Sequence, residues 1–336
     1  MKDEILSRIQ KKFPLVAKPF EAIANELDIS EDEVLKILQE QKKASIIRQT
    51  SAIFDTKRLG YKSSLVAFKI QPEQINAAVK ILNSHPGISH NYERNHDFNI
   101  WFTMAVAPDS KLGLEKTVAL LSKLTDAEDY IMLPTLKLFK INVKLNTTGK
   151  DDKKEKVKKI THTEIEMTEL HHKVVRMAQY DIDIVSEPFK KIIDELNITY
   201  DKFFEILSEL QAAGVMRRFA SILNHRKAGF NANAMVVWDV DEGERGEAIG
   251  ANAASFSAVS HCYLRPKYEN WPYNLFTMVH GKTKEETNGI IADMAKEIDS
   301  KNHMPLYSSR EFKKVRIEYF TPAFSEWEDK YSSEVA

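Results

Sequence analysis

The sequence predicts an α+β protein in which one folding unit is present twice in tandem. Two observations lead to this fold class. Blocks of residues recur in the same order in both halves of the chain, and in each half helical periodicity is followed by alternating strands and helices. The chain has 336 residues, which is enough for about two to four compact domains.

The repeat is clearest where it begins. Pro19-Phe20 returns as Pro188-Phe189, and residues 19–61 share 14 identities with residues 188–230 over 43 positions. Three further blocks follow in order: Ser89-His90-x-Tyr92-x-Arg94 with Ser260-His261-x-Tyr263-x-Arg265, Phe102-Thr103-Met104 with Phe276-Thr277-Met278, and Leu133 to Lys140 with Leu306 to Lys313. Chance does not explain four ordered blocks, so we infer a duplication.

Each unit is predicted to open with a winged helix-turn-helix. Residues 19–27 have apolar side chains at helical spacing. Ser30, with Glu33 three residues later, is a capping box that opens a second helix through about Lys43. Residues 46–48 and 52–54 are expected to form the two strands of a wing, and the second copy repeats the pattern from Phe189 to Leu223.

The rest of each unit reads β-α-β-β-α-β, which predicts a ferredoxin-like domain with helices on one face of one sheet. In the first copy we expect strands at 65–70, 88–94, 100–106 and 136–144, and helices at 72–83 and 111–124. In the second we expect strands at 233–240, 259–265, 274–280 and 312–320, and helices at 242–255 and 284–302.

Domain boundaries follow from these elements and from composition. We expect a first winged-helix domain at 1–61 and a first ferredoxin-like domain at 62–146. A charged linker at 147–163 has no apolar periodicity. A second winged-helix domain at 164–230 and a second ferredoxin-like domain with a C-terminal tail at 231–336 complete the chain.

Composition excludes several classes of protein. The single cysteine, Cys262, rules out an intrachain disulfide and a cysteine-rich metal site. No apolar run approaches the roughly 18 residues that span a bilayer, and the N-terminus lacks the apolar core of a signal peptide. We therefore expect a cytoplasmic protein with no membrane partner. The net charge of −1 lacks the basic surplus typical of proteins that neutralise DNA phosphates.

A winged helix followed by such an α/β domain resembles the Lrp/AsnC family of regulators, whose first domain binds DNA and whose second binds small ligands. The second helix of a helix-turn-helix presents its N-terminal residues to the bases. Here these residues are Ser30-Glu31-Asp32-Glu33, and in the second copy the helix start, 199–205, is again acidic and carries Phe203-Phe204, a pair expected to be exposed. Carboxylates facing a polyanion argue against DNA binding. A DNA-binding regulator that responds to heme or a metabolite is the alternative.

The candidate chemistry lies in the His-x-Tyr-x-Arg strings. Alternate residues of a strand face one side, so each string presents an imidazole, a phenol and a guanidinium together. The candidate catalytic residues are His90, Tyr92, Arg94, His261, Tyr263 and Arg265. Duplication copies structural residues as well, so a structural role for the strings remains open.

Further basic and aromatic residues are candidates for substrate binding, because guanidinium groups suit carboxylates and flat rings stack on flat ligands. The alternatives are solvated surface charge and ordinary core packing. The candidates are Arg48, Arg217, Arg218, Lys137, Lys140, Arg310, Lys313, Trp101 and Trp271.

The strings His90-Asn-Tyr-Glu-Arg94 with Asn99-Ile-Trp-Phe-Thr103, and His261-Cys-Tyr-Leu-Arg265 with Trp271-Pro-Tyr-Asn-Leu-Phe-Thr277, resemble siroheme decarboxylases. These enzymes have an Lrp/AsnC-like fold, and the resemblance covers nearly the whole chain. It implies removal of two acetate carboxyl groups from siroheme, giving didecarboxysiroheme and carbon dioxide in heme biosynthesis. It implies no cofactor beyond the iron-tetrapyrrole substrate and no DNA partner.

Paired members of that family have two subunit types, so the resemblance implies a heterodimer fused into one chain. Whether the fused chain dimerises further is left open. His90 or His261 is the candidate for a proton donor or for a ligand of the siroheme iron, and the sequence does not separate these roles. The second copy has Arg217-Arg218 where the first has Arg48-Gln49, and a three-residue insertion before Phe276. The two sites are therefore expected to differ.

Overall fold

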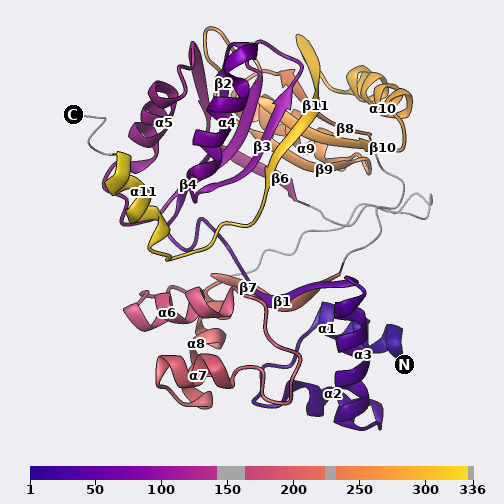
Figure 1. Cartoon of the computed structure of the whole chain (residues 1–336). Helices are drawn as coiled ribbons and strands as arrows, with labels where there is room; N and C mark the ends of the chain where they lie inside the picture. The colour runs from indigo at the N-terminus through magenta and orange to yellow at the C-terminus, as the bar shows by residue number, and fades with distance from the viewer. Residues whose placement is uncertain (142–162, 224–231, 332–336) are drawn as a thin grey trace. The chain divides into compact units, whose positions relative to one another are not determined.

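A computed structural model describes residues 1–141, 163–223 and 232–331 (Figure 1). The chain divides into two compact units. The winged-helix unit consists of Met1–Tyr61, Glu318–Pro322 and the described residues between Lys158 and Arg226; the α/β unit holds the remainder. Each unit therefore combines the corresponding parts of both copies, where the sequence predicts four separate domains. Within the described ranges, every helix is too short or too polar to cross a membrane.

The winged-helix unit has three helices from each copy. The first copy supplies α1 (Lys2–Lys11), α2 (Pro19–Leu27) and α3 (Glu31–Lys43), and the second supplies α6 (Glu169–Ala178), α7 (Lys190–Leu196) and α8 (Tyr200–Ala212). The predicted cap is present: Ser30 Oγ accepts from the Glu33 N–H at 3.2 Å. Helices α1 and α6 lie before the repeated block at 19–61 and 188–230, and the sequence analysis did not predict them.

Aromatic side chains from both copies share one core in this unit. The ring of Phe13 lies 5.8 Å from Phe20 and 5.3 Å from Phe219. Phe203 is fully buried, with its ring 5.5 Å from that of Phe189. The expectation that Phe203 is exposed is therefore wrong, because its helical position faces the core that the two copies build together.

The predicted two-stranded wings are also wrong. Each copy has one continuous strand, β1 (Ile47–Phe54) or β7 (Met216–Leu223), and the two pair antiparallel with each other as a ribbon. Residues 49–51 contain neither Gly nor Pro to turn the chain. Because neither strand has a hairpin partner in its own copy, each pairs with the equivalent strand of the other copy.

In the α/β unit each copy contributes a sheet with helices on one face. The first copy has β2 (Lys62–Lys69), β3 (Ile88–Arg94), β4 (Ile100–Val106) and β5 (Asp129–Leu133), with the short η1 (Pro72–Gln74) and with α4 (Ile75–Ser84) and α5 (Gly113–Leu124). The second has β8 (Ala232–Asp239), β9 (Val259–Leu264), β10 (Leu275–Gly281) and the first part of β11 (Asn302–Lys314), with α9 (Gly243–Ser255) and α10 (Lys284–Glu297). A C-terminal helix, α11 (Ala323–Tyr331), packs on the first copy through Trp327.

The closing strands differ from those predicted. Strand β5, not 136–144, completes the first sheet by pairing with β2. The described part of the predicted strand forms β6 (Lys137–Ile141), which adds to β9 of the other copy. Likewise 312–320 is not the second closing strand. The first part of β11 pairs with β8 and its second part pairs with β3 of the first copy. The two copies thus exchange strands reciprocally in one nine-stranded order, β5-β2-β4-β3-β11-β8-β10-β9-β6.

The pairing also corrects the repeat alignment. Tyr92 is opposite Trp101, whereas Tyr263 is opposite Phe276. Trp101 and Phe276 are therefore equivalent, and the match of Phe102 with Phe276 is out by one residue. The insertion before Phe276 is four residues rather than three. This shift matters because a slip of one residue moves a side chain to the other face of the sheet.

Three apolar cores hold the α/β unit together. One lies between the first sheet and α4 and α5, and a second lies between the second sheet and α9 and α10. The third, which we call the central core, joins the remaining faces of the two sheets. Figure 1 shows the helices beside the strands of their own copies. Each sheet therefore has a helix face and a central face.

Candidate active site

The His-x-Tyr-x-Arg strings lie on the central faces of β3 and β9. Tyr92 and Tyr263 are paired with Trp101 and Phe276, which belong to the central core. The intervening residue of β3, Asn91, points to the helix face, where its Nδ2 donates to Asn83 of α4 at 3.0 Å. The alternation of strand side chains then places each His, Tyr and Arg on the central side, as the sequence predicts.

The two arginines lie deepest, and they bond across the copies. Nη1 of Arg94 donates to the Leu306 carbonyl of the second copy at 2.8 Å. Nη1 of Arg265 donates to the Leu133 carbonyl of the first copy and lies 3.3 Å from Thr135 Oγ1. Both guanidinium groups are buried. Their contacts favour a structural role at the points where each chain crosses to the other sheet.

The tyrosines lie between the arginines and the histidines. The guanidinium carbons of Arg94 and Arg265 are 5.6 and 4.8 Å from the ring centroids of Tyr92 and Tyr263. Burial and, next, the charge of Glu311 raise the pKa of Tyr92 to about 12. Tyr92 therefore stays protonated near neutral pH and can donate a hydrogen bond.

The histidines are partly exposed, and each contacts the serine that precedes it. Nδ1 of His90 lies 3.0 Å from Ser89 Oγ, and Nδ1 of His261 lies 2.7 Å from Ser260 Oγ. Burial and the Lys314 charge lower the pKa of His90. Burial and the His90 charge lower the pKa of His261. The two imidazoles, one from each copy, are therefore within electrostatic range and neutral near pH 7.

The serines have different second partners in the two copies. Ser89 Oγ lies 3.0 Å from Thr103 Oγ1, whereas Ser260 Oγ lies 2.6 Å from Nε2 of His280. Nδ1 of His280 in turn lies 2.8 Å from Asn233 Oδ1. Sequence reasoning missed these residues. Only the serines carried a signal, as the first residue of the repeated string, because the positions of His280 and Asn233 are occupied by Ala105 and Ser63 in the first copy.

The four candidate basic residues of β6 and β11 lie on the helix side of the sheet. Lys140 Nζ donates to the Phe256 carbonyl at the end of α9 (2.9 Å), and Lys313 Nζ donates to the Asn83 carbonyl at the end of α4 (2.8 Å). Cations at helix C-termini stabilise the unpaired carbonyl groups there. Two further basic residues make ion pairs on the same helix faces, Lys137 with Glu247 and Arg310 with Glu93. The structure therefore does not bring these four residues together with the histidines.

The two predicted tryptophans are core residues. Trp101 and Trp271 are each about 1% exposed, and their rings are 5.3 Å apart in the central core. A ring so enclosed cannot stack on a ligand without repacking the core. Their contacts favour packing of one sheet on the other.

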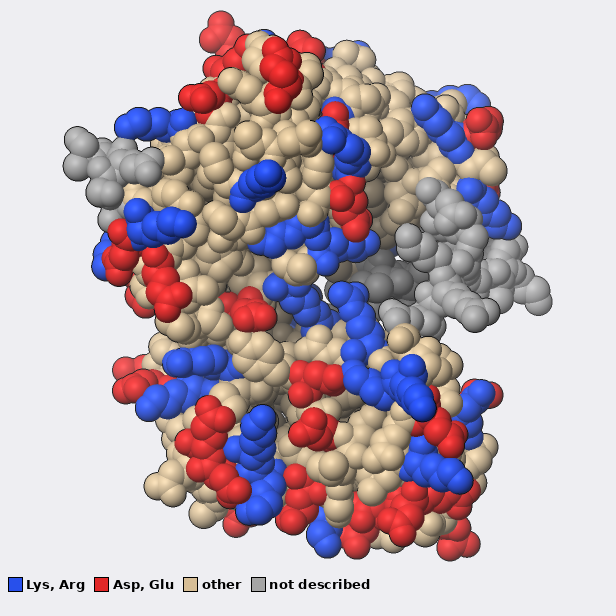
Figure 2. Space-filling view, viewed as in Figure 1, with Lys and Arg blue, Asp and Glu red and all other residues tan. Residues whose placement is uncertain are grey.

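The remaining candidates lie in the winged-helix unit. Arg48, Arg217 and Arg218 are exposed on the β1–β7 ribbon, and Arg217 pairs with Asp55 at 2.8 Å. Their role in substrate binding stays a prediction. Figure 2 shows Asp and Glu side chains gathered over α2 and α3, in agreement with the acidic first turn of α3.

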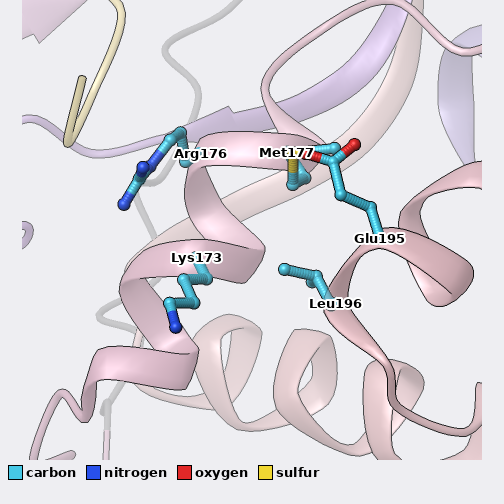
Figure 3. A pocket seen from close by; sticks show the side chains of 5 residues that line it. All are labelled: Lys173, Arg176, Met177, Glu195 and Leu196. Atoms are coloured by element: carbon cyan, nitrogen blue, oxygen red, sulfur yellow. The ribbon is translucent and has the colours of Figure 1, made fainter. Parts of the chain in front are cut away.

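A separate hollow in the winged-helix unit lies between α6 and α7 (Figure 3). It is lined by Lys173, Arg176, Met177, Glu195 and Leu196. Lys173 pairs with Glu169 at 3.0 Å, an ordinary pair along one helix. None of the candidate residues lines this hollow. Within the described ranges, no group of three or more His, Cys, Asp or Glu side chains is arranged to hold a metal ion.

Comparison with known proteins gives the family. Residues 58–140 and 227–313 match an AsnC-like ligand binding domain, and residues 2–48 and 171–217 match the siroheme decarboxylase NirDL-like HTH domain. The siroheme decarboxylase of Hydrogenobacter thermophilus is 40% identical over 97% of this chain and 96% of its own. The chain belongs to the siroheme decarboxylase family.

Two further comparisons bear on the duplication. In Desulfovibrio desulfuricans the alpha subunit of siroheme decarboxylase is 39% identical over 43% of this chain and 81% of its own length, and the beta subunit is 34% identical over 44% and 93%. Separate subunits there correspond to parts of one chain here. A crystal structure of siroheme decarboxylase NirDL in complex with an iron-uroporphyrin III analogue superposes with a TM-score of 0.82, at 35% identity over 99% of both chains. The predicted tandem fold is confirmed.

Proposed function

We propose that this protein is a siroheme decarboxylase, a carbon–carbon lyase that converts two ring acetates of siroheme to methyl groups. The supporting observation is the full-length match to a siroheme decarboxylase. A relative with the same fold binds an iron-uroporphyrin analogue, which supports an iron tetrapyrrole as the substrate. We propose no cofactor beyond the iron of the substrate.

The chemistry can be assigned to the central faces of β3 and β9. Each step breaks the bond between the acetate methylene carbon and the carboxylate carbon, which leaves as carbon dioxide. The electron pair remains on the methylene carbon, where the macrocycle delocalises it, and a proton then forms the methyl group. His90, His261 and Tyr92 are the proposed groups for proton transfer or iron ligation. Arg94 and Arg265 hold the strands that carry them.

The direct test is anaerobic incubation of the full chain with siroheme, followed by mass spectrometry. We expect loss of one and then two carbon dioxide units. The same measurement on His90→Ala and His261→Ala variants reports whether either imidazole is required. An unchanged tetrapyrrole with the wild-type protein would contradict the proposal and favour a regulator or carrier.

The alternative of a DNA-binding regulator is opposed by charge. The first turn of α3 carries Glu31, Asp32 and Glu33, and that of α8 carries Asp201. These carboxylates would face the phosphates of a bound duplex. A gel shift with duplex DNA in moderate salt tests this alternative, and we expect no retarded band.

A further inference from the structure

The hydrogen-bond chain behind His261 has a direction. Asn233 offers Oδ1, which only accepts, to Nδ1 of His280 at 2.8 Å. With the Asn233 amide oriented in this way, Nδ1 of His280 carries the proton. A neutral imidazole has one N–H, so Nε2 of His280 is an acceptor. Burial and the charge of His261 lower the pKa of His280, which keeps its ring neutral near pH 7.

That direction passes through Ser260 to His261. Because Nε2 of His280 accepts, the Ser260 hydroxyl donates to it across 2.6 Å. The same oxygen is then left to accept from Nδ1 of His261 at 2.7 Å. His261 consequently carries its proton on Nδ1. Its Nε2 holds a lone pair, and no described residue hydrogen-bonds to that atom.

The first copy lacks this constraint. The strand pairing makes Ala105 the counterpart of His280, because the Ala105 N–H donates to Gly87 and the His280 N–H donates to Ala258 at equivalent bulges. Ser89 instead contacts the hydroxyl of Thr103 at 3.0 Å. Two hydroxyl groups donate and accept equally well. Nothing in this pair fixes which nitrogen of His90 carries the proton.

We propose that His280, acting through Ser260, is a positioning residue that locks His261 in the tautomer with its proton on Nδ1. The second copy then presents an Nε2 lone pair, suited to ligate the substrate iron or to accept a proton. His90, without a lock, can present Nε2–H and deliver a proton. This inference rests on the proposed function for the identity of the substrate, but the lock itself is a property of the protein without substrate.

The test uses nuclear magnetic resonance. The full, substrate-free chain is produced with histidine labelled with the heavy nitrogen isotope, and long-range proton–nitrogen correlation spectra are recorded. These spectra distinguish the two neutral tautomers of a histidine. The chain has 10 histidines, and the His261 signals are identified by their loss in His261→Gln. We expect the Nδ1–H pattern for His261 in the wild type. The Nε2–H pattern would overturn the proposal.

Three variants test the origin of the lock. His280→Ala, which copies Ala105, should give His261 a mixture of tautomers and lower the decarboxylation rate by about 10- to 100-fold. His280→Gln should restore much of the Nδ1–H pattern of His261 and much of the decarboxylation rate, because the amide oxygen of glutamine can accept a hydrogen bond from Ser260. Asn233→Asp changes an exposed side chain to one that only accepts, and the Nδ1–H pattern should persist. A His261 tautomer unchanged in His280→Ala would refute the role of His280.

A matched control in the first copy is Thr103→Met, which introduces the residue that the second copy has at that position, Met278. It should leave the His261 pattern unchanged. Failure of the proposed function is a separate outcome. A locked His261 in a wild-type protein that does not alter siroheme would leave the tautomer result standing and refute only the decarboxylase assignment.

Discussion

Arg94→Met asks whether the buried guanidinium of the first copy supports the fold or binds the substrate. Burial lowers the pKa of Arg94 from 12.5 to about 10, which corresponds to a cost of about 3 kcal/mol for keeping the charge. The hydrogen bond from Arg94 Nη1 to the Leu306 carbonyl, at 2.8 Å, stabilises the folded state by about 1.5–3 kcal/mol. The contact with the Tyr92 ring at 5.6 Å adds about 0.5–2 kcal/mol.

These contributions nearly cancel. Methionine has a similar length and no charge, so we expect Arg94→Met to change the free energy of unfolding by less than about 2 kcal/mol. Arg94→Ala leaves a cavity instead and should cost about 2–5 kcal/mol. Urea unfolding measures both. Because the contacts of Arg94 are structural, decarboxylation by Arg94→Met should stay within about tenfold of the wild type.

One result would refute this reasoning. If Arg94→Met unfolds like the wild type but loses more than about 100-fold in turnover, the guanidinium contacts the reacting substrate. The catalytic role suggested by the strand pattern would then hold. Arg265→Met is the matched variant in the second copy, and its outcome should be the same because its contacts are equivalent.

Three further predictions concern catalysis, packing and pH. His261→Ala should abolish decarboxylation without unfolding the protein, and wild-type rates by mass spectrometry would remove its catalytic assignment. Gly250→Ala should destabilise the fold by about 1–3 kcal/mol, because its Cβ would lie 2.4 Å from the ring of Phe139; the control Gly289→Ala meets nothing within 4 Å and should stabilise by up to about 1 kcal/mol in urea unfolding. Burial lowers the pKa of His85 from 6.5 to about 3, so its neutral form stabilises the fold above pH 6.5. The free energy of unfolding should fall by up to about 5 kcal/mol as the pH drops from 6.5 toward 3. Urea unfolding across that pH range measures the fall, which should be smaller in His85→Gln.

The sequence predicts most local structure correctly because periodicity and caps are local signals. Strands β3 and β4 begin and end where expected, and Ser30 caps α3. Strand exchange is different, because β6 and the second part of β11 pair with residues far away in sequence. A closing strand in one copy and an added strand in the other have similar patterns, so periodicity alone does not tell them apart.

The sequence predicted the part of the candidate site that depends on local pattern. Alternation along a strand is enough to place His90 and Tyr92 on one face. It does not tell whether a basic residue of another strand faces the same side, and Lys140 and Lys313 proved to cap helices on the opposite face. His280 was not predicted because a comparison of the two copies finds the residues that they share, and the first copy has Ala105 at this position.

The difference between the two copies has a consequence for how two such sites can evolve. In a homodimer every substitution appears in both protomers, so a residue that suits one site is imposed on the other. Here His280 and Ala105 occupy corresponding places in one chain, and either can change without the other. Two non-identical copies, whether joined in one chain as here or separate as in relatives with alpha and beta subunits, can therefore take different roles, which identical protomers cannot. Joining them in one chain fixes their ratio at one to one, and the exchanged strands β6 and β11 make the sheet of each copy depend on the other.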